Sequence, residues 1–261
     1  MNGSVFFMGV TEYGLACFKK LVHMGVNIVG CIYTNDQIVM KIQPEGMRNV
    51  TYIDFKAIAE QYSIDCIHFD KTNPDEFVQC IKEIKPDLII VAGWHYIIKP
   101  EVYEMPRFGT VGLHPSMLPR YRGGSPLVWQ IINGESKSGV SLFYIADGID
   151  TGDVIGQESF TIDDTDTIKE AYIKSQEAAV KLLEYYVPQI LNGAAPRIKQ
   201  NENDATYVKQ RCPADGEIDW SETPENIRNF IRAQSKPYPG AFTYISNKKV
   251  IIWDAEIVED I

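Results

Sequence analysis

The sequence predicts an α/β protein with a doubly wound, Rossmann-like parallel sheet and a small, shortened β-rich subdomain at its C-terminal end. Short apolar runs of strand length alternate with segments of helical apolar spacing from residue 5 to about residue 191. This alternation is typical of parallel sheets joined by right-handed crossovers. Loops rich in Gly and Pro follow several of the apolar runs, as expected where a chain leaves the carboxyl ends of strands.

The first half of the chain contains most of the expected parallel strands. They are expected at residues 5–8, 26–33, 66–69, 88–92 and 110–113, and helices at residues 15–23, 55–61 and 74–84. The first helix is supported by Leu15, Phe18 and Leu21, which share one helical face. Residues 34–52 show no clear period, so we expect a mobile loop over the site there.

The second half completes the large domain and adds a smaller one. Helices are expected at residues 125–132, 166–191 and 224–234, and strands at residues 140–145, 154–160, 241–246 and 250–258. Residues 194–219 are rich in Asn, Asp, Gly and Pro. We therefore expect a catalytic domain over residues 1–193, a linker over 194–219 and a small subdomain, helix plus β-hairpin, over 220–261.

Composition limits the class of partner and compartment. The net charge of −10 argues against a nucleic-acid partner, because such binding depends mainly on Lys and Arg. The five cysteines are odd in number and never two to four residues apart, which predicts neither a disulfide framework nor a zinc site. The chain shows no cationic leader and no apolar run long enough to span a membrane. We expect a cytoplasmic protein without a metal.

A breaker-rich loop at residues 114–126 is the first candidate site. His114 follows the apolar strand at its carboxyl end, where ligands bind in open α/β sheets. Arg120 and Arg122 lie in the same loop and offer fork-shaped donors to an anion. The plainer alternatives are a polar loop with a backbone-capped His and solvated Arg side chains.

Two further segments place polar or aromatic residues beside this loop. In the segment 146–153, Asp147, Asp150 and Asp153 crowd one turn, which suits a carboxylate beside an imidazole but also an ordinary Asp/Gly turn. The segment 93–100 carries Trp94 and His95. Trp94 is equally compatible with a ligand contact and a core anchor, and His95 with a ligand and a satisfied polar residue.

The motifs HPSMLPRYRGGSPL (residues 114–127) and DGIDTGDVI (residues 147–155) together resemble the signature of the N10-formyltetrahydrofolate-dependent formyltransferases. This family includes methionyl-tRNA formyltransferase, glycinamide ribonucleotide formyltransferase and the sugar N-formyltransferases. The shared features are the His-x-Ser-x-Leu-Pro loop, the Arg-Gly that follows and an Asp at the family's distance from the His. Weaker similarity extends from Val5 to about Val258.

The resemblance implies a set of site residues. The family's catalytic trio is Asn, His and Asp; the His maps onto His114 and the Asp onto Asp150, but the Asn maps onto Gly112. An oxyanion site that is only partly filled is therefore expected. The resemblance also implies two groups of binding residues. The folate contacts are Trp94, Tyr96, Ile97, Ile98, Ala146, Asp147, Gly148 and Ile149, and the acceptor contacts are Ser116, Arg120, Arg122 and Arg232.

The C-terminal segment indicates the acceptor. Arg232 with residues 237–244 resembles the amino-sugar branch most closely, and about forty residues are too few for the closed barrel of the tRNA enzyme. The expected activity is formyl transfer from N10-formyltetrahydrofolate to a nucleotide-linked amino sugar, a small-molecule partner, by a possible homodimer. The alternatives are methionyl-tRNA or glycinamide ribonucleotide as acceptor, or a folate- or nucleotide-binding protein that has lost catalysis.

Overall fold

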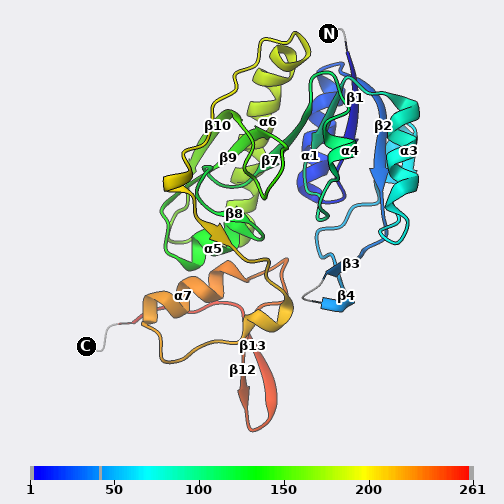
Figure 1. Ribbon diagram of the computed structural model, residues 1–261. Coiled ribbons are helices and arrows are strands. Elements are labelled where there is room, and N and C mark those ends of the chain that lie inside the picture. The colour runs from blue at the N-terminus through cyan, green and yellow to red at the C-terminus, as the bar shows by residue number, and fades with distance from the viewer. Residues whose placement is uncertain (1–2, 41–42, 259–261) are drawn as a thin grey trace.

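The computed structural model describes residues 3–40 and 43–258. Its largest feature is a seven-stranded sheet in the order β10-β9-β7-β6-β1-β2-β5 (Figure 1). The strands are β1 (Ser4–Met8), β2 (Asn27–Tyr33), β5 (Cys66–His68), β6 (Leu88–Val91), β7 (Thr110–His114), β9 (Lys137–Tyr144) and β10 (Val154–Thr161). The predicted α/β class is confirmed. The parallel arrangement covers the strands from β5 to β7, whereas β9 and β10 are antiparallel to their neighbours.

Helices cover both faces of this sheet. They are α1 (Glu12–His23), α2 (Phe55–Gln61), α3 (Pro74–Ile84), α4 (Pro100–Tyr103), α5 (Pro126–Ile132), α6 (Ile168–Leu191) and α7 (Pro224–Ala233). Successive side chains of a strand point to opposite faces. In β1, Val5 and Phe7 therefore join the apolar cluster that includes α1 and α6, while Phe6 and Met8 join the cluster that includes α3.

The segment after β2 is a hairpin, so the expectation of an irregular loop over residues 34–52 is wrong. Strands β3 (Gln37–Met40) and β4 (Gln43–Arg48) pair antiparallel, with Gln37 opposite Arg48 and Ile38 opposite Met47. The ladder is short and its sequence includes Gly46 at φ +84°. Ile38 of β3 is buried, but each strand is too short to give a clear hydrophobic period in the sequence.

The segment expected to be a linker packs on the large domain. This segment contains two short helices, η1 (Glu202–Asp204) and η2 (Pro213–Gly216), with β11 (Tyr207–Val208) between them along the chain. Strand β11 pairs in parallel with β8 (Arg122–Gly123), which belongs to the loop after β7. The boundaries of the domains remain a prediction.

Beyond α7, β12 (Ala241–Ile245) and β13 (Lys248–Ile252) form the expected hairpin, which projects from the body of the molecule (Figure 1). The strand expected to reach residue 258 ends at Ile252. Among the described residues, no helix is long and apolar enough to cross a membrane.

Candidate active site

His114 is the last residue of β7, and its ring is held by the loop that follows. The side chain is 7% exposed. Its Nε2 lies 2.8 Å from the carbonyl oxygen of Tyr121. The loop is fastened to β9: the Ser116 hydroxyl donates to the carbonyl of Arg120 at 2.7 Å, and the Ser141 hydroxyl donates to the carbonyl of Ser116 at 2.7 Å. The direction of the ring is therefore set by buried hydrogen bonds.

Asp150 reaches His114 by an indirect path. Because β9 is antiparallel to β7, the chain leaves β9 beside Thr110, at the end of the strands opposite to His114. The loop returns, and Asp150 adopts φ +54°, with its Oδ2 3.5 Å from His114 Nδ1. The backbone N–H of Gly123 donates to the same oxygen at 2.8 Å. The structure thus brings the two predicted catalytic residues together.

These contacts assign different roles to the two nitrogens of His114. A carbonyl oxygen can only accept a hydrogen bond, so Nε2 carries a proton and donates it to Tyr121. In the neutral ring, Nδ1 then has a free lone pair beside the carboxylate of Asp150. A proton taken up at Nδ1 would be stabilised by that carboxylate.

The position of the family Asn is closed to a side chain. Gly112 lies in β7 opposite Val91 of β6 and Phe143 of β9. A Cβ built on Gly112 would lie 2.8 Å from Ile145 Cδ1 and 3.0 Å from Phe143 Cε1. The ring of Phe143 also meets the ring of His114 edge-on, with their centroids 6.5 Å apart. Apolar side chains therefore fill the space beside Gly112.

Arg122 is a structural clamp, which corrects the expectation that it binds the acceptor. Its side chain is fully buried, and all its donor atoms are engaged. Nε and Nη2 donate to Gln200, Nη1 and Nη2 donate to the carboxylate of Glu202, and Nη1 also donates to the Tyr207 hydroxyl. Since a guanidinium has only five N–H groups, no donor remains for a substrate anion. Gln200 in turn donates to the carbonyl of Asp150 at 2.8 Å.

The other predicted acceptor residues also have partners within the protein. Ser116 is fully buried, with its hydroxyl on Arg120. The guanidinium of Arg120 pairs with Glu135 at 2.5 Å. Arg232 donates to Asn229 and to backbone carbonyls in the turn before α6. Arg120 lines a cavity of about 370 Å³ together with its partner Glu135. None of these predicted acceptor side chains lines the pocket between the β3–β4 hairpin and the C-terminal part of the chain.

The predicted folate segments present apolar side chains outside the core. Trp94 and Tyr96 pack against Phe69 with ring centroids 5.0 and 5.4 Å away, and Ile98 is partly buried in the same cluster. Ile97 is 92% exposed. In the other segment Ala146 is partly buried, Asp147 and Gly148 are exposed, and Ile149 is 56% exposed. Exposed apolar side chains beside an aromatic backing suit the flat ring of a folate.

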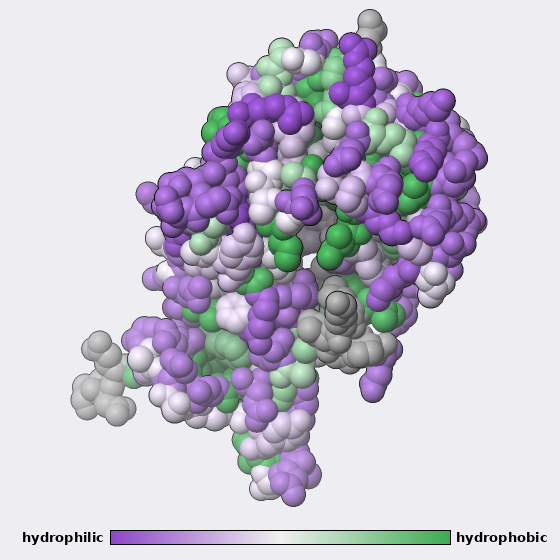
Figure 2. Space-filling model, viewed as in Figure 1, coloured by the Kyte–Doolittle hydropathy of each residue, from purple (hydrophilic) through white to green (hydrophobic). Residues whose placement is uncertain are grey.

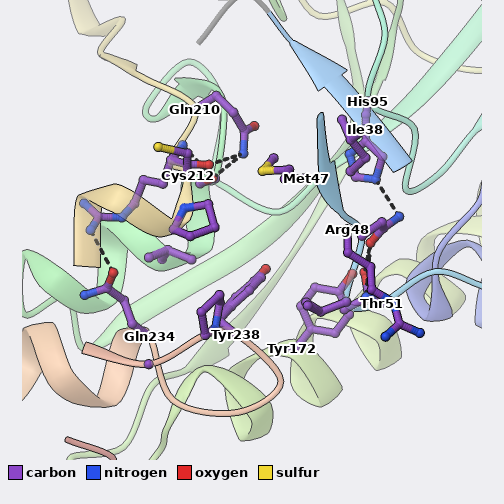
Figure 3. Close-up of a pocket in the computed structure, with 18 residues that line it drawn as sticks. Ile38, Met47, Arg48, Thr51, His95, Tyr172, Gln210, Cys212, Gln234 and Tyr238 are labelled. Carbon is purple, nitrogen blue, oxygen red and sulfur yellow. Dashed lines mark hydrogen bonds between the residues drawn. The ribbon is translucent and has the colours of Figure 1, made fainter. Parts of the chain in front are cut away.

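A pocket lies between the hairpin β3–β4 and the C-terminal part of the chain (Figure 3). Its volume is about 160 Å³. Residues 47–51, His95 and Tyr172 line one side, and residues 210–213 and 238–240 line the other. In the surface view, hydrophobic residues lie on two sides of a hollow near the middle of the molecule, and hydrophilic residues lie above and below it (Figure 2).

The pocket and the catalytic contact share the loop that follows β7. Ser125 lines the pocket, and Ser125 follows Gly123, the donor to Asp150, by two residues. The lining of the pocket includes residues 38 and 47–51 of the segment expected over the site, and residues 238–240 of the segment that resembles the amino-sugar branch. Of the individual candidate residues, His95 is the one that lines it. The wall combines three segments that are distant along the chain, and no spacing rule connects them.

Two family models match the chain: "Formyl transferase" over residues 15–187 and "Formyl transferase, C-terminal domain" over residues 212–261. The chain is 32% identical over 257 residues to a methionyl-tRNA formyltransferase of Caldanaerobacter subterraneus subsp. tengcongensis, covering 98% of this chain and 81% of that one. It is 33% identical over 244 residues to the bifunctional polymyxin resistance protein ArnA of Wigglesworthia glossinidia brevipalpis, covering 94% of this chain but spanning only 36% of that protein.

A solved structure shows the same fold. It is an N-formyltransferase of Helicobacter canadensis in complex with folinic acid and dTDP-3-aminofucose, with a TM-score of 0.73 at 21% identity over 95% of this chain and 86% of that one. The family matches confirm the formyl donor expected from the motifs, N10-formyltetrahydrofolate. The chain belongs to the formyl transferase family.

Proposed function

We propose that this chain transfers the formyl group of N10-formyltetrahydrofolate to the primary amine of a nucleotide-linked amino sugar. The charge of the pocket that Ser125 lines, in the same loop as Gly123, carries this proposal. The whole chain has a net charge of −10, yet the described residues that line the pocket include Arg48 and Arg211 and neither Asp nor Glu. A cationic pocket in an acidic protein suits an anionic small molecule such as a nucleoside diphosphate.

Arg211 is the stronger of these two anion contacts. Its guanidinium stacks on Trp129 and Phe230, with 4.9 and 5.4 Å to the ring centroids, and Nη2 donates to Gln234 at 2.9 Å. Arg211 forms no ion pair among the described residues, and its Nη2 also donates to the backbone carbonyl of Asp215. Burial lowers its pKa, and the Asp215 carboxylate, within electrostatic range, acts in the opposite direction. A desolvated, preorganised cation that is not ion-paired is stabilised by a bound anion. Arg48, by contrast, pairs with Asp36 at 3.2 Å.

The size and lining of the pocket favour a small acceptor over the arm of a tRNA. Residues 210–213 and 238–240 form one wall, and the Gln210 side chain donates to the Ser125 hydroxyl at 2.8 Å. Tyr172, Tyr238 and Met47 supply apolar and aromatic surface for a base or a sugar face. In the Helicobacter canadensis protein of the same fold, the bound sugar nucleotide is dTDP-3-aminofucose.

Within this proposal His114 and Asp150 act on the proton of the amine. The amine must lose a proton to attack the formyl carbon, and the lone pair of His114 Nδ1 accepts it. Asp150 stabilises the imidazolium that results. The same proton is then available to the folate nitrogen that leaves as the new C–N bond forms and the old one breaks.

The folate donor supplies the activated formyl carbon when it is bound. The segments 94–98 and 146–149 would hold its ring. Asp147 lies within electrostatic range of Tyr103, the last residue of α4: burial first, then the carboxylates of Glu104, Asp147 and Glu101, raise the pKa of Tyr103. The segment 146–149 therefore lies near α4, the helix that follows the segment 94–98.

A panel of nucleotide-linked amino sugars incubated with N10-formyltetrahydrofolate, read by mass spectrometry, tests the proposal. We expect a product heavier by one formyl group, at the sugar amine, with one member of the panel. Arg211→Met should raise KM for that sugar nucleotide about tenfold or more, because a charge-assisted hydrogen bond contributes roughly 1.5–3 kcal/mol. Arg228→Met, whose guanidinium donates to the carbonyl of Asp164, is the matched control.

The same assay separates the alternatives. If the protein formylates methionyl-tRNA or glycinamide ribonucleotide and no amino sugar, the proposed acceptor is wrong. A protein that binds the folate but turns over none of the three acceptors would be a binding protein without catalysis. Free tRNA should neither compete with the sugar nucleotide nor raise the melting temperature at physiological salt.

A further inference from the structure

The Asn that serves as a hydrogen-bond donor in the family is replaced here by Gly112. Neighbouring side chains fill the space that an Asn side chain would need. Formyl transfer passes through a tetrahedral species whose oxygen becomes negative, and a hydrogen-bond donor at that oxygen is among the largest single contributions to such catalysis. At Gly112 the rings and methyl groups of Phe143 and Ile145 take up the room of a side chain. A donor must therefore come from a different element.

His95 stands on the neighbouring strand end. Strand β6 pairs in parallel with β7, Val91 opposite Gly112, so the chains that follow both strands leave the sheet at the same edge. The turn before His95 is closely packed: Gly93 has φ +67°, and a Cβ there would lie 1.9 Å from Thr11 Oγ1. The imidazole then lines the pocket to which Ser125, in the loop after β7, also contributes (Figure 3).

The hydrogen bonds of Asn49 determine which nitrogen of His95 carries the proton. Asn49 is 7% exposed. Its Oδ1 accepts from the backbone N–H of Thr51 at 3.1 Å and from the Thr51 hydroxyl at 3.0 Å. This fixes the orientation of the amide, so Nδ2, which can only donate, is the atom 3.1 Å from His95 Nε2. Nε2 is therefore the acceptor, and in the neutral ring the proton is on Nδ1.

The ring is neutral at physiological pH. Burial lowers the pKa of His95 to about 4. Among the described residues, the charged groups that line the same pocket are the cations Arg48 and Arg211, and no carboxylate lines it that could pair with a charged ring. His95 Nδ1–H is thus a neutral donor that stays protonated throughout the range in which an amine acceptor can be deprotonated.

We propose that His95 is the hydrogen-bond donor to the formyl oxygen in place of the family Asn, and that Asn49 and Thr51 are positioning residues that hold its tautomer. This inference rests on formyl transfer and is independent of which amine accepts the group. The bonds made and broken are those of the formyl transfer itself, and His95 keeps its proton throughout.

Three variants at these positions test the proposal. His95→Phe keeps a flat ring but removes the donor, so kcat should fall on the order of a hundredfold while KM for the folate changes little. His95→Gln keeps an amide donor and should recover part of the loss. His68→Phe is the matched control, because His68 lies at the end of β5 and stacks on Tyr33 rather than lining the pocket.

Asn49→Asp gives a readout that a structural role would not produce. The new carboxylate would accept from Nε2–H, so the neutral ring would turn a lone pair toward the formyl oxygen. Only the doubly protonated ring could then donate, and kcat should acquire a new fall as pH rises, absent from the wild type. A ¹⁵N NMR spectrum of the imidazole reports the protonated nitrogen directly in each folded protein.

The outcomes are separable from the identity of the acceptor. A wild-type spectrum with the proton on Nε2 overturns the proposal even if no amino sugar is turned over. With the acceptor found in the screen, an unchanged kcat in a folded His95→Phe protein overturns it as well. A hundredfold loss in kcat, recovered in part by Gln and accompanied by the new pH dependence in Asn49→Asp, supports it.

Discussion

Two histidines stand at neighbouring strand ends of this enzyme, and their partners give them opposite properties. His114 donates from Nε2 to a carbonyl, which leaves Nδ1 as a basic lone pair beside Asp150. His95 accepts at Nε2 from the amide of Asn49, which leaves Nδ1–H as a donor. One ring is arranged to take up a proton and the other to keep one. The hydrogen-bond partner of each Nε2 therefore determines whether Nδ1 of that histidine is a proton acceptor or a donor.

The largest expected effect comes from removing the basic member of this comparison. His114→Asn and Asp150→Asn should each lower kcat by roughly two to four powers of ten, because proton transfer by a positioned base contributes about that much. The double variant should cost little more than the worse single one, since the two side chains act as a unit. Steady-state kinetics of the three proteins measure this. Losses that simply add would show that His114 and Asp150 act independently.

The contact between His114 and Asp150 could be predicted because both residues lie in contiguous motifs with a known spacing. The path to that contact could not, since the antiparallel direction of β9 sends Asp150 away from His114 before the loop returns. Sheet direction depends on strand pairing, which a single apolar run does not encode.

The role of Arg122 could not be predicted for a related reason. A loop Arg offers five donors, and the sequence gives no sign that Gln200 and Glu202, about eighty residues further on, take them. The segment that supplies them was expected to be a linker. The meeting of residues 47–51, 210–213 and 238–240 in one pocket wall was not predicted either, because these segments lie far apart along the chain.

Substitution of Arg122 tests the comparison of the two histidines, because it should loosen Asp150, the partner of His114, and leave the partners of His95 in place. Arg122→Met removes the cation that holds Gln200, and Gln200 holds the carbonyls of Asp150 and Gly152. We expect the free energy of unfolding to fall by about 1–3 kcal/mol, because buried polar partners lose a hydrogen bond. We also expect kcat to fall about tenfold, because a displaced catalytic group loses its alignment. The His95 tautomer should be unchanged.

Urea unfolding and steady-state kinetics measure the two effects of Arg122→Met. Glu202→Gln is the control, because the Glu202 side chain is 66% exposed and can be solvated when the ion pair is lost. An Arg122→Met protein with normal kcat would mean that Gln200 holds the Asp150 loop without help.

Restoring the family Asn tests whether His95 replaces it. The side chain introduced by Gly112→Asn would meet Phe143 and Ile145, because a Cβ at Gly112 would already lie 3.0 Å or less from each. We therefore expect the single substitution to lower the free energy of unfolding by about 1–3 kcal/mol through overpacking. Phe143→Met in the same protein gives the introduced Asn a smaller and more flexible neighbour.

The double variant Gly112→Asn/Phe143→Met then provides the functional readout. If the introduced Asn reaches the formyl oxygen, His95→Phe should cost less kcat in this background than in the wild type, because two donors share one oxygen. An identical loss in both backgrounds would mean that the two residues do not serve the same oxygen.

The smallest effect is the pH dependence of stability that His95 contributes. Its pKa is about 4 in the folded protein and about 6.5 in an unfolded chain. Between these values the unfolded chain binds more protons, so the free energy of unfolding rises with pH across this window. At pH 5 the protein should have lost on the order of 1–2 kcal/mol of the contribution that is fully present above about pH 6.5.

His95→Gln isolates this contribution, because Gln keeps a polar side chain in the pocket but does not titrate. Urea unfolding of both proteins at pH 7 and pH 5 should show a smaller loss for the variant, and the difference between the two losses is the share of His95. His68→Gln should leave the loss as in the wild type. Equal losses for wild type and His95→Gln would mean that the His95 ring is protonated as readily in the folded protein as in the unfolded chain, and a ring of that kind would be a second base at the strand ends rather than a fixed donor.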